Sequence, residues 1–143
     1  MSRDFMKERD DRPADDIVPP ESSHPNYVTP RGLSALKARH SAAEEPREIA
    51  YLEGRIESAI LIDHAADPPQ TVQFGATVRI EDGEQLNREF TIVGEDEADV
   101  ARGFISYVSP LAQALIDGKI GQSVTWKRPA GDLQIVIRSI AYR

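Results

Sequence analysis

Residues 105–131 read ISYVSPLAQALIDGKIGQSVTWKRPAG, and this stretch decides the fold. The run over 104–108 predicts a strand. Ser109 followed by Pro110 predicts the start of a short helix, because Ser can cap free N–H groups and Pro suits the first helical position. The helix is expected to stop near Gly118, and turns and strands follow it.

The sequence on either side predicts the remaining strands of a small sheet. Apolar residues alternate from Val72 to Ile80, which indicates a half-buried strand. Asp82-Gly83 suits a tight turn, and residues 90–93 resume as a strand. Further strands are expected at 124–127 and 133–141. The pattern predicts a mainly antiparallel sheet with one short helix on a face.

Residues 29–62 show the period of a helix instead. Thr29-Pro30 predicts a helix start, and Pro46 marks an interruption. Two apolar stripes recur at helical spacing: Leu33, Leu36, His40 and Ala43, then Ile49, Leu52, Ile56 and Ala59. Helices over 29–43 and 46–62, each roughly 25 Å long, predict a short antiparallel hairpin with a coiled-coil-like seam. The predicted fold class is therefore α+β.

The composition divides the chain into three parts and limits its function. Residues 1–26 form an acidic, Pro-rich tail that is expected to be disordered, 27–66 form the hairpin, and 67–143 form the sheet domain. The net charge of −7 argues against direct binding to duplex nucleic acid, which needs clustered Lys and Arg side chains. There are no cysteines, so disulfides and thiolate metal sites are excluded. Without a signal peptide or a membrane-spanning run, we expect a soluble, cytoplasmic monomer.

An ordered set of short motifs runs through the chain. They are YVT at 27–29, Gly32, Leu36, FGA at 74–76, IVGE at 92–95, IS at 105–106, SPLA at 109–112, AL at 114–115, GK at 118–119, Gly121 and PAG at 129–131. In order and spacing this set resembles one family, the Gre-type transcript cleavage factors of bacterial RNA polymerase. The resemblance covers roughly residues 71–142, and the start of the hairpin also fits.

The resemblance implies an FKBP-like C-terminal domain that docks at the rim of the polymerase secondary channel. It also implies a hairpin that enters the channel. The polymerase-binding residues it assigns here are Val108, Ser109 and Pro110, although the family often has a polar residue where this chain has Val108. In members with cleavage activity, acidic residues at the hairpin tip help hold a second Mg²⁺, which activates water for RNA hydrolysis.

This sequence departs from the cleaving members at the hairpin. Its hairpin is short, and the tip lacks their acidic motif, which is followed by Asn-Ala and an aromatic residue. Glu44, Glu45 and Glu48 are the only weak metal candidates, and they also suit a solvated turn near a helix N-terminus. We therefore expect no catalytic residue and no cofactor, with Mg²⁺ only if these three carboxylates act.

Three functions remain open from the sequence. The leading one is an accessory factor that binds RNA polymerase near the secondary channel and modulates elongation without cleavage, meeting nucleic acid only through the polymerase. The second is an active cleavage factor that uses Glu44, Glu45 or Glu48. The third is a protein-binding module like the short-hairpin regulators of nucleoside diphosphate kinase.

Several other polar residues are expected to have structural roles. The three histidines match no metal motif, and His40 lies on the predicted seam. Tyr107 and Trp126 are expected in the core or on a sheet face. The acidic run at 95–99 suits either a solvated loop or a contact with a basic surface on the polymerase.

Overall fold

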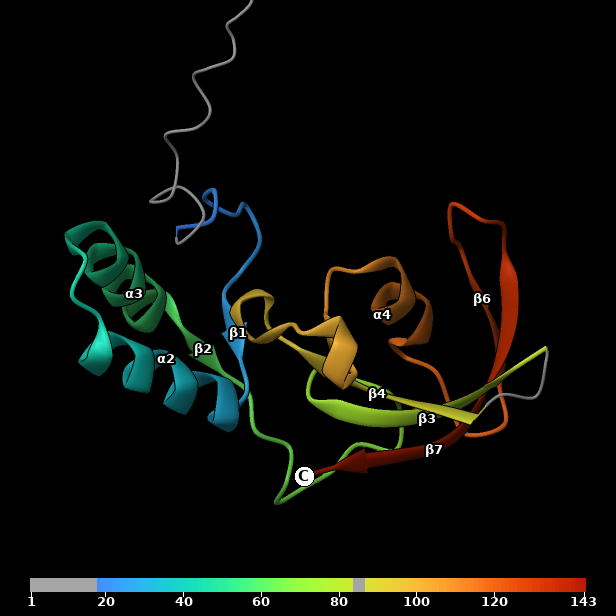
Figure 1. Cartoon of the computed structure of the whole chain (residues 1–143). Coiled ribbons are helices and arrows are strands. Elements are labelled where there is room, and N and C mark those ends of the chain that lie inside the picture. Colours follow the sequence, from blue (N-terminus) through green and yellow to red (C-terminus); the bar gives the residue numbers. More distant parts are fainter. Residues whose placement is uncertain (1–17, 84–86) are drawn as a thin grey trace, which may run out of the picture.

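The computed structural model describes residues 18–83 and 87–143 and contains a helical hairpin beside a curled sheet (Figure 1). This arrangement confirms the predicted α+β class. The disorder predicted for residues 1–17 concerns a segment outside the described residues. Within the described part of the chain, no helix is both long enough and apolar enough to cross a membrane.

The hairpin consists of α2 (Pro30–Ala42) and α3 (Pro46–Ser58). Each helix has 13 residues, so each is about 20 Å long, shorter than expected. The side chain of Thr29 accepts a hydrogen bond from the backbone N of Gly32 and caps α2. Glu45 caps α3 in the same way, because its carboxylate accepts from the backbone N of Glu48 at 3.0 Å.

The predicted seam between the two helices is confirmed. Leu36 and Leu52 are buried in it together with Val28, and the other predicted stripe residues that line it are half-buried: Leu33, Ala43, Ile56 and Ala59. His40 has the structural role expected of it. Its Nε2 lies 3.1 Å from Glu53 Oε2 and links α2 to α3.

The second helix ends four residues earlier than predicted, because the chain enters a short ribbon. Strand β1 (Tyr27–Val28) pairs in parallel with β2 (Ile60–Leu61). The two ends of the hairpin are therefore hydrogen-bonded to each other. Pairing of segments that lie more than 30 positions apart leaves no local pattern in the sequence.

The main sheet has five strands in the order β5-β4-β3-β7-β6. They are β3 (Ala76–Asp82), β4 (Asn87–Val93), β5 (Phe104–Ser106), β6 (Ser123–Trp126) and β7 (Leu133–Tyr142). The pairings β3–β4, β3–β7 and β6–β7 are antiparallel, in agreement with the predicted mainly antiparallel sheet, whereas β4–β5 is parallel. Parallel neighbours need a crossover, which the 3-10 turns η2 (Glu95–Glu97) and η3 (Val100–Arg102) provide.

The sheet curls around a single apolar core that α4 (Pro110–Leu115) covers (Figure 1). The helix ends before the expected stop near Gly118, because its C-cap Ile116 leaves the helical region with ψ of 138° and Asp117 follows in a left-handed conformation with φ of 71°. Strand β3 begins later than the predicted Val72. That residue is buried, but its backbone pairs with the turn after α4, donating to Gly118 O and accepting from Asp117 N.

The predicted tight turn after the first long strand is only partly visible. Asp82 still belongs to β3, where it is 8% exposed. Residues 84–86 lie outside the described residues, and β4 begins at Asn87. The turn predicted at Asp82-Gly83 therefore stays a prediction.

Residues 18–26, which we call the N-terminal strap, run along the hairpin and the sheet domain (Figure 1). Asn26 is only 6% exposed there. Residues 18–26, which fall in the tail expected to be disordered, thus have a described path and polar contacts with the rest of the protein, while the boundary at residue 26 stays a prediction. The strap, VPPESSHPN, has no periodic apolar pattern, so the sequence pattern could not reveal its hydrogen bonds.

Gly94 marks the closest crossing between the hairpin root and the sheet. A Cβ atom at this position would lie 2.2 Å from the backbone oxygen of Tyr27. Backbone atoms cannot move aside as a flexible side chain can. The absence of a side chain at residue 94 therefore lets β1 pass over the end of β4.

We predict that Gly94→Ala destabilises the protein by about 3 kcal/mol, because the added methyl group overpacks this crossing. Gly54→Ala is the matched control. Gly54 lies in α3 with nothing within 4 Å of its added Cβ, so the same change should stabilise by up to about 1 kcal/mol. Denaturant unfolding measures both, and equal effects would contradict the close crossing.

Candidate functional site

Val108, Ser109 and Pro110 form a corner between β5 and α4, which we call the 108–110 corner. Ser109 caps the helix, since its Oγ accepts from Ala112 N at 3.3 Å. Pro110 occupies the first helical position and is exposed, while Val108 and Ser109 are half-buried. The corner thus presents one exposed ring on a backbone that the helix cap stabilises.

Tyr107 holds the backbone of the corner in place. Its N donates to Val93 O at 2.9 Å, and its carbonyl oxygen accepts from Gln113 Nε2 at 2.8 Å. The N of Val108 donates to Ser106 Oγ at 3.2 Å. These bonds join the corner to β4, β5 and α4.

The ring of Tyr107 belongs to an aromatic trio with Tyr27 and Phe74. Ring centroids lie 5.2 Å apart for Tyr27–Tyr107, 5.6 Å for Phe74–Tyr107 and 5.9 Å for Tyr27–Phe74. Tilted and edge-on pairs at such separations are favourable. Since Tyr27 begins the hairpin, the trio connects the root of the hairpin to the corner. Tyr107 is partly in the core, as expected, but the sequence did not indicate this connection.

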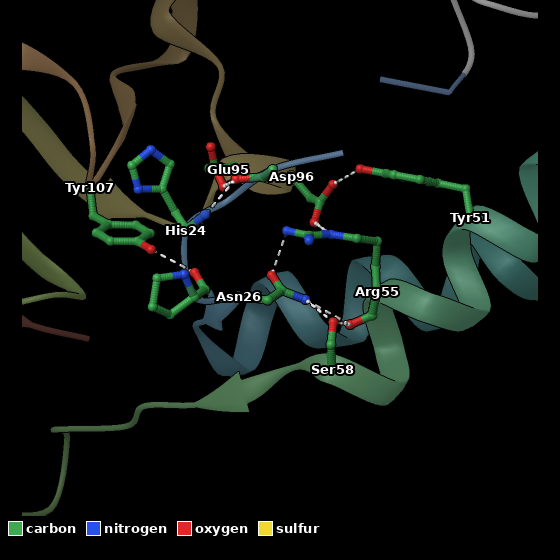
Figure 2. Close-up of polar contacts among 10 residues, drawn as sticks. His24, Asn26, Tyr51, Arg55, Ser58, Glu95, Asp96 and Tyr107 are labelled. Carbon is green, nitrogen blue, oxygen red and sulfur yellow. Dashed lines mark hydrogen bonds and ion pairs between the residues drawn. The ribbon is translucent and has the colours of Figure 1, made fainter. Parts of the chain in front are cut away.

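Asp96 joins the sheet domain to the outer face of α3 (Figure 2). Its carboxylate accepts from Arg55 Nε at 2.7 Å and from the Tyr51 hydroxyl at 2.5 Å. Only 15% of the Arg55 side chain and 10% of the Asp96 side chain are exposed. A pair so shielded from water, with its hydrogen bonds satisfied, holds the two elements in one orientation.

The Tyr51 hydroxyl acts in this cluster as a donor. Burial, followed by the hydrogen bond to Asp96, raises the pKa of Tyr51 to about 12. The phenol therefore keeps its proton at neutral pH and can donate to the carboxylate. Tyr51 and Arg55 are four residues apart in α3, so both side chains reach Asp96 from one helix face.

The neighbouring acids of η2 accept three further hydrogen bonds, two from the hairpin and one from the strap. Glu97 accepts from Thr29 Oγ1 at 2.6 Å and from Arg31 Nη1 at 2.8 Å, at the start of α2. Glu95 accepts from Ser22 Oγ of the strap at 2.7 Å. We call Glu95, Asp96 and Glu97 the acidic clamp.

The expectation of a solvated loop at 95–99 is wrong for Asp96 and Glu97, because both carboxylates face the hairpin. Arg31 and Arg55 lie outside the two predicted apolar stripes, whereas the ring of Tyr51 packs against the seam and its hydroxyl reaches Asp96. The sequence did not indicate that acids of the sheet domain are the partners of these side chains.

The carboxylates at the hairpin tip do not converge. Glu45 is the cap of α3, Glu48 lies 3.7 Å from Arg39 Nη2, and Glu44 is exposed. Among the residues that the structure describes, no group of three or more His, Asp or Glu side chains could hold a metal ion. Two of the three weak metal candidates thus already have partners within the hairpin.

Comparison with known proteins agrees with the motifs. The family model for the C-terminal domain of the transcription elongation factors GreA and GreB matches residues 67–142. The chain belongs to the GreA/GreB family. This match contains both the 108–110 corner and the acidic clamp.

Relatives in the Gre family extend the similarity toward the N-terminus. GreA of Beijerinckia indica is 41% identical over 112 residues, which cover 74% of this chain and 71% of that protein. GreA of Novosphingobium aromaticivorans is 33% identical over 135 residues, with 94% of this chain and 84% of that protein covered. The second alignment reaches well beyond the C-terminal domain.

Two solved structures of Gre proteins are also similar. The GreA/GreB factor of Nitrosomonas europaea is 22% identical with a TM-score of 0.47, over 83% of this chain and 99% of that one. The GreA factor homolog Gfh1 of Thermus thermophilus is 16% identical with a TM-score of 0.46, over 82% and 99%.

We predict that Asp96→Ala in this Gre-family chain costs about 3 kcal/mol of stability, because it leaves the shielded guanidinium of Arg55 without its counter-charge. The matched control is Glu89→Ala. Glu89 is 44% exposed and lies 3.8 Å from Arg79, so its loss should cost less than about 1 kcal/mol. Urea unfolding of both variants measures the difference, and similar values would mean that the clamp contributes no more than a surface pair.

Proposed function

We propose that this chain is a transcription elongation factor that binds bacterial RNA polymerase at the rim of the secondary channel and modulates elongation without stimulating transcript cleavage. The observation that carries the proposal is the combination of a Gre-family C-terminal domain with a hairpin of two 13-residue helices. The domain supports binding. The short hairpin, whose tip carboxylates do not converge, argues against metal-assisted transcript cleavage.

Binding is assigned to the 108–110 corner. Its backbone is held by β4, β5 and α4, and Pro110 is exposed. A rigid site loses little conformational entropy when a partner binds. The chain is acidic overall, so the expected partner is the polymerase protein rather than its nucleic acid. We expect it to act as a monomer, in the cytoplasm with the polymerase.

We do not assign transcript cleavage to this chain, because its hairpin is short and two of its tip carboxylates already have partners. Hydrolysis assisted by a metal ion requires carboxylates close to the metal and its bound water. Because the helices are only about 20 Å long, the tip of this hairpin reaches less far than the tip of the longer hairpin in cleaving members. Glu45 is occupied with Glu48 N, and Glu48 faces Arg39. Accordingly, we propose no cofactor for the protein itself.

Pro110→Glu is predicted to weaken binding to core RNA polymerase about tenfold or more, as expected for a residue at the centre of an interface. The fold should survive, because an acid is favourable near a helix N-terminus. Ser139→Glu, an exposed position on β7, is the control and should bind like the natural protein. Fluorescence titration measures both affinities. If the natural protein is folded and does not bind, the proposed function is wrong.

On backtracked elongation complexes, we predict that the natural protein leaves RNA cleavage at the intrinsic rate of the polymerase. Cleavage is followed with end-labelled RNA, with and without the protein, at a concentration that saturates binding. Stimulation that disappears when Glu44, Glu45 and Glu48 are all changed to Ala would instead establish an active cleavage factor. Thermal unfolding of that triple variant is needed as a control, since it also removes the cap of α3.

A further inference from the structure

The N-terminal strap contacts both halves of the molecule through a few polar groups. On the sheet side, Ser22 Oγ donates to Glu95 Oε1 at 2.7 Å, and the carbonyl oxygen of Pro25 accepts from the Tyr107 hydroxyl at 2.5 Å. On the hairpin side, the strap is held by Asn26. Figure 2 shows these contacts on one side of α3.

Asn26 uses both ends of its side-chain amide at the end of α3. Its Nδ2 donates to Arg55 O at 2.8 Å and to Ser58 Oγ at 3.1 Å, and its Oδ1 accepts from Arg55 Nη2 at 2.7 Å. Its backbone oxygen accepts from Ile60 N at 2.8 Å. Arg55 therefore binds the strap and Asp96 at once, and the strap completes the contact between hairpin and sheet.

Apart from these bonds, the strap stands away from the helix. Between the strap and the outer face of α3 lies a cleft of about 980 Å³, lined on the helix side by residues such as Ala50 and Gly54. The strap residues exposed to solvent include Ser23, His24 and Pro25. Its position thus depends on hydrogen bonds rather than on packed apolar surface.

The hairpin and the sheet domain have separate hydrophobic cores. Leu36, Leu52 and Val28 form one cluster, and the residues of the sheet and α4 form the other. Domains joined by polar contacts are expected to move relative to each other unless specific bonds prevent it. Here those bonds come from the acidic clamp, the strap and the aromatic trio around Tyr107.

We propose that the N-terminal strap is a lock that sets the direction of the hairpin relative to the 108–110 corner, with Tyr107 as the positioning residue. Tyr107 lies directly before the corner in the chain, its hydroxyl holds the strap, and its ring packs on Tyr27 at the hairpin root. The relevance of the corner rests on the proposed function. The lock itself is a property of the free protein.

One consequence is a coupling between the corner and the hairpin. A partner that shifts Tyr107 away from Pro25 would release the strap and free the hairpin to move. By thermodynamic reciprocity, a change that frees the hairpin would alter binding at the corner. Burial, followed by the charge of Glu95, raises the pKa of Tyr107, so its hydroxyl remains a donor at neutral pH.

The experiment uses the full chain without polymerase. Lys37→Cys in α2 and Ser139→Cys in β7, both exposed, carry spin labels in a protein that has no cysteine of its own. Electron–electron resonance gives the distance distribution between hairpin and sheet. Tyr107→Phe keeps the ring and removes only the hydroxyl, and Asn26→Ala removes the contact at the other end of the strap.

The matched control is Tyr142→Phe. The Tyr142 hydroxyl donates to Thr71 O at 2.6 Å and accepts from Gln73 N at 2.8 Å, away from the strap. We expect a broader or shifted distribution for Tyr107→Phe and Asn26→Ala, and the natural distribution for Tyr142→Phe. Circular dichroism confirms that each variant is folded.

Two outcomes would overturn the lock. The first is a natural distribution in Tyr107→Phe and Asn26→Ala. The second is an equal change in Tyr142→Phe, which would indicate general loosening of the sheet domain. Because polymerase is absent, these outcomes are independent of whether the protein binds polymerase, which the Pro110→Glu titration decides separately.

Discussion

The ion pair between Arg55 of the hairpin and Asp96 of the sheet domain joins two bodies that have separate hydrophobic cores. Apolar burial stabilises each body, and across the junction it includes the packing of Tyr27 on the sheet core. Orientation needs directional contacts, and a shielded guanidinium–carboxylate pair supplies them. The Tyr51 hydroxyl and Asn26 satisfy remaining hydrogen-bonding groups around that pair, so the charges are not left without partners.

The position of the 108–110 corner follows from this junction. Tyr107 is bonded to Val93, and the next residue, Gly94, lets the hairpin root cross the sheet. The acidic clamp begins immediately after, at Glu95. The surface proposed for polymerase binding and the support of the hairpin therefore lie on two neighbouring segments that the Tyr107–Val93 hydrogen bond joins. In the proposed function, the domain provides binding and the short hairpin provides no metal chemistry.

Sequence patterns predicted the features that depend on local periodicity and capping. The seam around Leu36 and Leu52, the Thr29 and Ser109 caps and the mainly antiparallel sheet appear as expected. The parallel pairing of β5, the ribbon between β1 and β2, and the partners of Asp96 were missed. Each of these joins segments distant in sequence, and period-based reasoning contains no information about which distant segment will pair. The role of the 108–110 corner and of Glu44, Glu45 and Glu48 in function stays a prediction.

By itself, the sequence determined the α+β class, the shortness of the hairpin and membership of the Gre family. Each of these depends on local properties: helical and strand periods, proline positions and an ordered set of motifs. Only the tertiary structure decided that an acidic run expected in solvent clamps the hairpin, and that the strap of residues 18–26 is hydrogen-bonded to both the hairpin and the sheet domain. A carboxylate looks the same in sequence whether it faces water or a guanidinium. Its partner is chosen by the path of the whole backbone.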